Sequence, residues 1–139
     1  MKMTIMEIQD QIIGEMSVHE DWFDRYEALI ALGNALDSSD ESLRTDEYRI
    51  SGCQSAVWLR SGLRDGRLRL SADSDSQITR GMLALLLRVF DGQPPDEVAD
   101  AELYMLDAIG LRGNLSPSRA NGLSTIVRAI REAARRHTA

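Results

Sequence analysis

Residues 57–90, VWLRSGLRDGRLRLSADSDSQITRGMLALLLRVF, are the stretch that decides the fold. Polar and apolar residues alternate through Arg67-Leu68-Arg69-Leu70-Ser71, which is typical of a half-buried strand. The Asp65-Gly66 pair before it favours a tight hairpin turn, so residues 57–61 and 67–71 are expected to pair as antiparallel strands. From Ile78 onward the apolar residues recur at helical spacing, which predicts a helix that is buried on most sides and ends near Gly92.

Helical patterns lie on both sides of this stretch. The apolar spacing predicts helices over residues 4–16 and, capped by Asp21, over residues 21–33. After the hairpin it predicts short helices over residues 95–101 and 102–109, and a long helix from Ser116-Pro117 to about Arg136. The polar, acidic residues 36–47 are expected to form a surface loop. We therefore predict an α+β fold, with a small antiparallel sheet packed against several helices.

Length and composition restrict the class of protein. The 139 residues are the size of one compact domain, and 43% hydrophobic with 27% charged residues is ordinary globular composition. A single cysteine excludes an intramolecular disulfide and the zinc or iron–sulfur sites that need several cysteines. The richest apolar run, residues 81–87, is too short to span a membrane. Because Glu7 and Asp10 come so early, we expect no secretory signal and a cytoplasmic protein.

The charge balance argues against nucleic-acid partners. The chain has 16 basic and 22 acidic residues, for a net charge of −6, and such a chain is a poor partner for phosphate backbones. The cluster Arg128, Arg131, Arg135 and Arg136 is predicted to be a solvated face of the last helix. Lys2 is the only lysine, which argues against Schiff-base chemistry on an internal lysine, and no Gly-Lys-Ser/Thr sequence of a P-loop occurs.

Cys53 is the first candidate for chemistry. A lone cysteine is usually a small buried hydrophobic residue. This one lies in Ser51-Gly52-Cys53-Gln54-Ser55, among small and polar neighbours, and Gly52 permits a sharp bend of the backbone. A reactive thiol needs partial exposure and polar surroundings. The residues alone therefore leave two interpretations open, a structural cysteine and a reactive one.

Other polar residues are weaker candidates. Asp73 and Asp75 are placed to cap the buried helix that follows them. Arg119 lies in the first turn of the last helix, where a cation is unfavourable, so we expect it to pair with a carboxylate or a sulfur anion. His19 and His137 are far apart in sequence and have no nearby third ligand, so no zinc site is expected.

Four stretches, taken together, resemble the SufE family of cysteine desulfuration proteins, the sulfur acceptors of iron–sulfur cluster assembly. They are residues 21–33, residues 52–58, residues 72–75 with Gly81, and residues 115–119 with Gly122-Leu123. The resemblance implies one SufE-like domain over residues 1–139, with an α+β fold similar to the U-type iron–sulfur scaffold proteins. It implies that Cys53 carries a persulfide, and that a short list of residues supports it: Gly52, Gln54, Asp75 and Arg119. The family's cysteine loop is partly sheltered at rest.

The resemblance also implies partners. The chain would take sulfur from a pyridoxal-phosphate-dependent cysteine desulfurase of the SufS/CsdA type, stimulate it, and pass the sulfur to an iron–sulfur scaffold. The pyridoxal phosphate belongs to the desulfurase, so no cofactor or metal is expected here. The chain would act as a stoichiometric carrier, as a monomer or a homodimer, rather than as a stand-alone enzyme.

Three alternatives compete with the carrier. In one, the chain is a docking module that regulates a desulfurase without covalent chemistry, and Cys53 is structural. In another it is a cluster scaffold, and in the third a thiol enzyme that reduces peroxide. One cysteine supplies neither the several ligands of a cluster nor a resolving thiol, so these two are less favoured.

Overall fold

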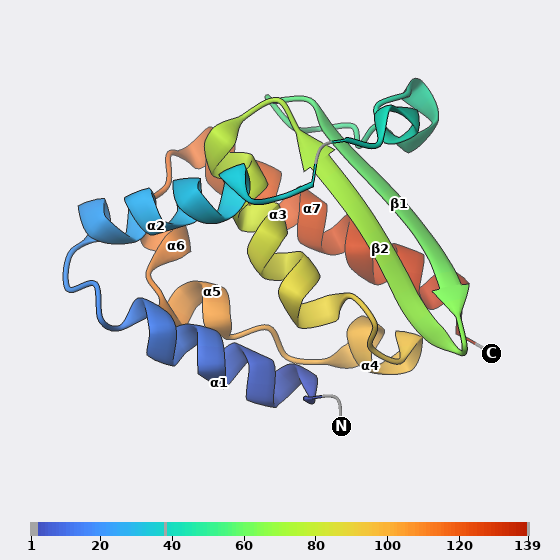
Figure 1. Ribbon diagram of the computed structural model, residues 1–139, viewed down its shortest axis with the longest axis horizontal. Coiled ribbons are helices and arrows are strands. Elements are labelled where there is room, and N and C mark those ends of the chain that lie inside the picture. The colour runs from blue at the N-terminus through green and yellow to red at the C-terminus, as the bar shows by residue number, and fades with distance from the viewer. Residues whose placement is uncertain (1–2, 38, 139) are drawn as a thin grey trace.

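The computed structural model describes residues 3–37 and 39–138, so Lys2 lies outside it. It confirms the α+β prediction, with one two-stranded antiparallel sheet and helices before and after it (Figure 1). In chain order the elements are α1 (Ile5–Met16), α2 (Trp22–Asn34), the 3-10 helices η1 (Glu41–Leu43) and η2 (Asp46–Tyr48), β1 (Val57–Arg64), β2 (Arg67–Ser74), α3 (Gln77–Phe90), α4 (Pro95–Asp100), α5 (Met105–Ala108), α6 (Leu111–Asn114) and α7 (Pro117–Arg136).

The hairpin forms where the sequence predicts it. Asp65 and Gly66 have φ angles of 54° and 75°, and two successive left-handed residues are what a type I′ hairpin turn requires. Both strands run further than predicted, with Val57 opposite Ser74. The reason is that the alternation of buried and exposed side chains continues to the buried Ala72. The backbone pairing then continues through Asp73 to Ser74.

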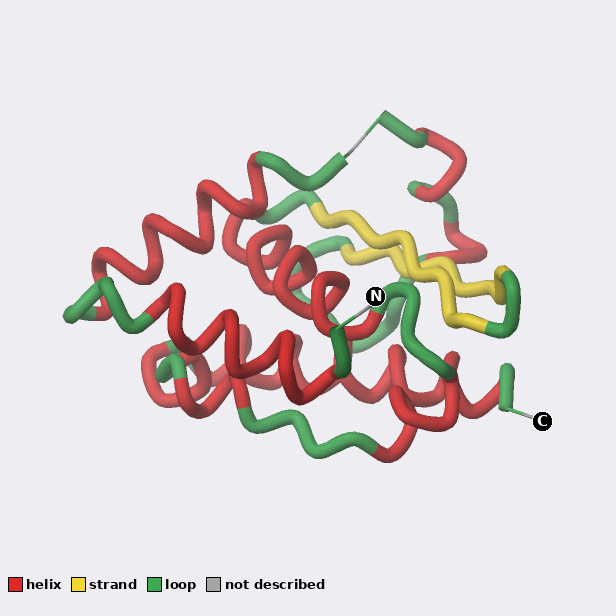
Figure 2. The backbone as a smooth tube through the Cα atoms, turned by 60° about the horizontal axis from the view of Figure 1, so that its bottom comes forward, coloured by secondary structure: helices red, strands yellow, loops and turns green. Residues whose placement is uncertain are grey.

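Helix α3 is the centre of the molecule. It packs against β2 on one side and against α2, α1 and α7 elsewhere, and Figure 2 shows it enclosed between the sheet and the other helices. The side chains of Leu83, Leu86 and Phe90 are fully buried. Helices α2 and α3 approach closely at Gly81, where a Cβ atom would lie 2.2 Å from the carbonyl oxygen of Leu29. This crossing therefore requires glycine at position 81.

The segment between α2 and β1 is more ordered than the surface loop we predicted. It contains η1 and η2, and Leu43 is buried in it. Arg44 Nη1 lies 3.2 Å from Asp73 Oδ2, and Arg80 Nε lies 3.3 Å from Asp73 Oδ1. The Arg80 guanidinium also donates to the Leu36 carbonyl oxygen at 2.9 Å. The ion pairs of Asp73 thus hold this segment against β2 and α3. The polar composition of the segment gave no indication of these contacts.

The helix predicted over residues 102–109 is shorter than expected. Only Met105–Ala108 forms α5, because the buried Gln9 side chain of α1 binds the backbone just before it. Gln9 Nε2 donates to the Glu102 carbonyl oxygen, and Gln9 Oε1 accepts from the amides of Tyr104 and Met105. The solvated arginine face on α7 is wrong for Arg131, which is half-buried and donates to carbonyl oxygens at the end of α4.

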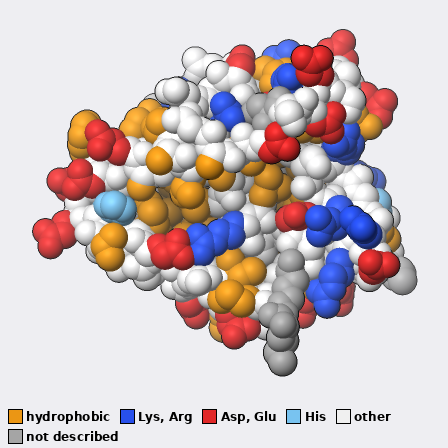
Figure 3. Space-filling model, in the orientation of Figure 1, with side chains coloured by type: hydrophobic (Ala, Val, Ile, Leu, Met, Phe, Trp, Pro, Cys, Tyr) orange, Lys and Arg blue, Asp and Glu red, His pale blue; other side chains and the backbone are white. Residues whose placement is uncertain are grey.

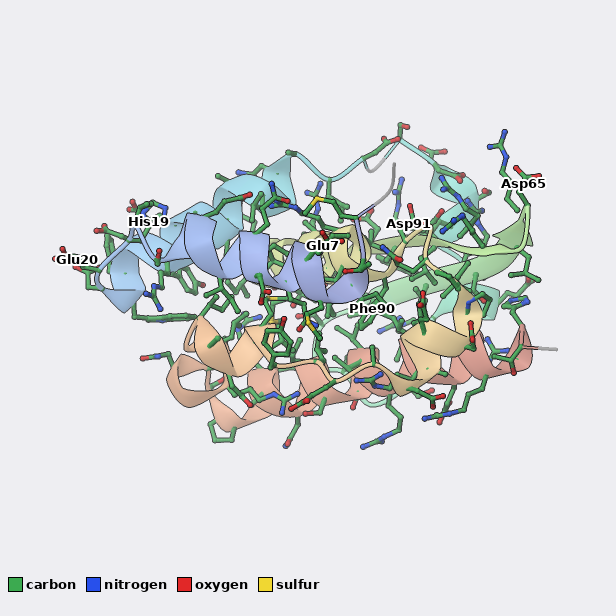
Figure 4. All side chains as sticks on the ribbon, turned by 90° about the horizontal axis from the view of Figure 1, so that it is seen from below. Glu7, His19, Glu20, Asp65, Phe90 and Asp91 are labelled. Carbon is green, nitrogen blue, oxygen red and sulfur yellow. The ribbon has the colours of Figure 1, made fainter. Side chains whose placement is uncertain are left out.

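Acidic side chains gather at the end of the molecule that holds the turn between α1 and α2, whereas side chains of both signs lie toward the hairpin end (Figure 3). Acidic side chains surround the turn between α1 and α2, where Figure 4 labels His19 and Glu20, and Asp65 lies at the other end, at the hairpin tip. Figure 3 shows Lys and Arg side chains grouped toward the hairpin end. Within residues 3–37 and 39–138, no helix combines the length and apolar character needed to cross a bilayer.

Candidate functional site

Cys53 lies in the turn that leads into β1. Gly52 before it has a φ of 89°, in the left-handed region that favours glycine, so the chain bends immediately before the cysteine. The Cys53 side chain is half-buried, and its Sγ lies 3.8 Å from the carbonyl oxygen of Gly122 on α7. The thiol therefore faces the first turns of α7 and not bulk solvent.

A small cavity adjoins the thiol. Its volume is about 20 Å³, which is room for about one water-sized guest. The walls come from the loop before β1 and its first residue, from the first two turns of α3, and from the first half of α7. The lining residues are Cys53, Gln54, Ser55, Val57, Thr79, Met82, Ser118, Arg119, Gly122 and Ile126. One part of the lining is apolar, and the rest presents hydroxyl and guanidinium groups. The structure thus brings Cys53, Gln54 and Arg119, three of the candidate residues, to one cavity.

The base of the cysteine loop is fixed to the end of β2. The amide of Ala56 donates to Asp75 Oδ1 at 3.0 Å, and the Asp75 amide donates to the Ala56 carbonyl oxygen at 3.2 Å. The hydroxyl of Ser74 donates to that same carbonyl oxygen at 2.7 Å. Three hydrogen bonds therefore hold Ala56, three residues after the thiol. Asp75 sets the position of the loop from outside the cavity.

The prediction that Asp73 and Asp75 cap α3 is wrong. Asp73 is buried inside β2 in contact with two arginines, and Asp75 binds Ala56. The N-cap is Ser76, whose hydroxyl accepts from the Thr79 amide at 3.4 Å. The strand continues through Asp73 to Ser74, and the Asp75 carboxylate is engaged by the Ala56 amide, so neither acid caps the helix.

Arg119 is half-buried in the first turn of α7. Its Nη1 donates to Ser76 Oγ at 3.1 Å, so the guanidinium is held between α7 and the start of α3. No ion pair joins Arg119 to Asp75 among the residues that the structure describes. The expected pairing with a carboxylate is therefore not made, and the guanidinium lines the cavity beside Cys53.

Burial controls the acidity of the thiol. It raises the pKa of Cys53, because removing the side chain from water disfavours the thiolate. The free protein accordingly keeps Cys53 as a neutral thiol at neutral pH. A reaction at this sulfur requires either deprotonation by an incoming group or movement of the loop toward solvent.

The sequence analysis missed Thr79. This side chain is 5% exposed and lines the cavity from α3. The available signal was a threonine directly after Ile78, at the start of a helix that was predicted to be buried on most sides. Within the described part of the chain, no three His, Cys, Asp or Glu side chains lie close enough to hold a metal ion.

The chain was compared with known proteins. Residues 10–134 match the SufE family model, described as an Fe-S metabolism associated domain. An uncharacterized SufE-like protein of Rhizobium etli is 40% identical over 131 residues, which cover 91% of this chain and 88% of that protein. The sulfur acceptor protein CsdE of Escherichia coli is 37% identical over 111 residues, covering 78% of this chain and 76% of CsdE.

A solved structure has the same fold. The solution structure of a hypothetical protein from Thermus thermophilus superposes with a TM-score of 0.75, covering 94% of this chain and 95% of that one. The two sequences are 16% identical, so the likeness concerns the fold alone.

Proposed function

The chain belongs to the SufE family, and we propose on that premise that it accepts sulfur from a cysteine desulfurase as a persulfide on Cys53. The observation that carries the proposal is the chain's single thiol beside a cavity of about 20 Å³ that also contains the Arg119 side chain. The name of the Escherichia coli relative, a sulfur acceptor, points to the same activity.

The transfer is a thiol–persulfide exchange without net oxidation. The Cys53 sulfur attacks the outer sulfur of a persulfide on the donor's cysteine, and a new bond forms between that outer sulfur and Cys53 Sγ. The bond between the outer sulfur and the donor's cysteine breaks, and the donor leaves as a thiolate. The proton of the Cys53 thiol is released to the donor thiolate or to solvent. One cysteine is enough, because the second sulfur partner is on another protein.

The cavity suits the product of this step. A guest of about the size of one water molecule is the order of size of one added sulfur atom. Val57, Met82 and Ile126 would shield that atom from water and oxidants, which limits the oxidation to which sulfur of this kind is prone. Arg119 would place a permanent cation in the wall of the cavity, where its charge stabilises a persulfide anion.

The partners follow from this chemistry. The donor is a pyridoxal-phosphate-dependent desulfurase, whose cofactor removes sulfur from free cysteine before the chain takes part. We propose that the chain stimulates this enzyme by removing the outer sulfur of the persulfide on the enzyme's cysteine. It then delivers this sulfur to an iron–sulfur scaffold in the cytoplasm. The raised pKa of the Cys53 thiol means that the resting chain reacts slowly, so reaction depends on docking to the donor.

The competing function is a docking module that stimulates the desulfurase without accepting sulfur. Turnover of free cysteine by a desulfurase, measured with the wild-type chain and with Cys53→Ser, separates the two. We expect the serine variant to fold and to bind the desulfurase but to give no stimulation and gain no labelled sulfur. Full stimulation by Cys53→Ser would establish the docking module and eliminate the carrier.

A further inference from the structure

We infer that Thr79 belongs to the sulfur site, and that its hydroxyl donates a hydrogen bond to the outer sulfur of the Cys53 persulfide. This rests on the proposed function. It adds a residue to which neither the sequence analysis nor the family resemblance assigned a role.

The first observation is an unpartnered hydroxyl. Thr79 is 5% exposed and lines the cavity that contains Cys53. Its amide donates to Ser76 Oγ, but its own hydroxyl makes no hydrogen bond to any residue that the structure describes. The Thr79 oxygen keeps some accessible surface, so the hydroxyl is free to donate to a guest in the cavity.

The second observation is the reason why the usual partner is missing. A threonine inside a helix commonly donates to the carbonyl oxygen four residues earlier. Thr125 on α7 does so, with its Oγ1 3.0 Å from the Asn121 carbonyl oxygen. Four residues before Thr79 is Asp75, which precedes the N-cap Ser76 and is not part of α3. The Thr79 hydroxyl therefore has no helical carbonyl oxygen four residues earlier, and it does not bond the Ser76 carbonyl oxygen three residues earlier either.

The third observation concerns the other donors around the cavity. The Arg119 guanidinium already donates to Ser76 Oγ, and the Thr79 hydroxyl has no competing acceptor. An outer persulfide sulfur carries negative charge when deprotonated, and hydrogen bonds to ionised acceptors are the strong ones. The apolar lining from Val57, Met82 and Ile126 reduces screening by water, which strengthens the contact further.

Valine is the isosteric replacement that removes the hydroxyl. Thr79→Val, Thr79→Ser and the wild type are equilibrated with the persulfide of glutathione, and the persulfide on Cys53 is quantified by mass spectrometry. We expect Thr79→Val to shift the exchange equilibrium against the Cys53 persulfide about tenfold, the factor that a hydrogen bond to a charged atom supplies, and Thr79→Ser to restore it. The thermal unfolding midpoint of Thr79→Val is expected to stay close to the wild-type value, because no hydrogen bond to a described residue is lost.

Thr125→Val is the matched control. Its hydroxyl is bonded to the backbone and Thr125 is outside the lining of the cavity, so this variant should retain the wild-type equilibrium. A folded Thr79→Val with the wild-type equilibrium constant would overturn the inference and leave the carrier function intact. A wild-type chain that takes up sulfur neither from glutathione persulfide nor from a desulfurase supplied with free cysteine would overturn both.

Discussion

Burial and the position of its loop determine the reactivity of the Cys53 thiol, which has no charged group in direct contact among the described residues. Its Sγ lies against the Gly122 carbonyl oxygen, and burial alone raises the pKa of the thiol. The hydrogen bonds on Ala56 fix the loop close behind it. In the resting chain the Cys53 thiol is therefore protected from solvent, and its reactivity depends on how easily the loop opens.

The pH dependence of alkylation tests the state of the thiol. Because burial raises the pKa of Cys53, the thiolate fraction of the folded chain at neutral pH is below that of an ordinary cysteine. We expect the rate of reaction with iodoacetamide to keep rising with pH beyond the point where the urea-unfolded chain levels off. A folded-state profile that levels off at lower pH than the unfolded one would contradict this account. The shape of the profile is compared, since burial also lowers the absolute rate.

Asp75 offers a test of the loop. Asp75→Ala removes the acceptor of the Ala56 amide, and with it one of the three hydrogen bonds that hold the base of the loop. We expect Cys53 to be alkylated about tenfold faster at fixed pH, because a hydrogen bond to a charged group no longer opposes opening. Asp75→Asn retains an acceptor oxygen and should stay close to the wild-type rate. Equal rates for the alanine variant and the wild type would show that this bond does not hold the loop closed.

At the scale of elements, the hairpin and α3 were predictable because their signals are local. The Asp65-Gly66 turn and the apolar stripe from Ile78 follow from the sequence without knowledge of the rest of the chain. The start of α5 was not predictable, since it depends on Gln9, more than 90 residues away in sequence. The ordered segment between α2 and β1 depends in the same way on the distant Asp73.

The crossing of α2 and α3 yields a stability prediction. In Gly81→Ala the added Cβ would lie 2.2 Å from the Leu29 carbonyl oxygen, so the two helices must separate. We expect a loss of about 2 kcal/mol or more in the free energy of unfolding, measured with urea. Gly14→Ala on α1 is the matched control, because no atom lies within 4 Å of its added Cβ.

The expected result for the control has the opposite sign. Alanine at position 14 should stabilise the chain by about 0.5 to 1 kcal/mol, since glycine inside a helix costs that amount relative to alanine. Equal effects of the two substitutions would contradict the close approach at Gly81. The yield of Cys53 persulfide should fall in Gly81→Ala only in proportion to the fraction of unfolded chain. That result would show that the crossing of α2 and α3 supports the fold and has no direct role in sulfur transfer.

At the scale of the whole molecule, the sulfur site lies where three elements begin or end. The register places Val57 opposite Ser74, so the Cys53 loop, the start of α3 and the start of α7 meet at the open end of the hairpin. The turn at Asp65 is eight residues along β1, which corresponds to roughly 25 Å. Cys53 and Arg119 were candidates from the sequence because their local settings are unusual. Thr79 became a candidate only when the fold brought α3 to the cavity.

The most direct test of the central claim is the mass of the intact chain after incubation with a cysteine desulfurase and free cysteine. We expect a gain of about 32 Da, the mass of one sulfur atom, located on Cys53 and removed by a reductant. Cys53→Ser should gain nothing under the same conditions. A wild-type chain that binds and stimulates the desulfurase but keeps its original mass would contradict the account.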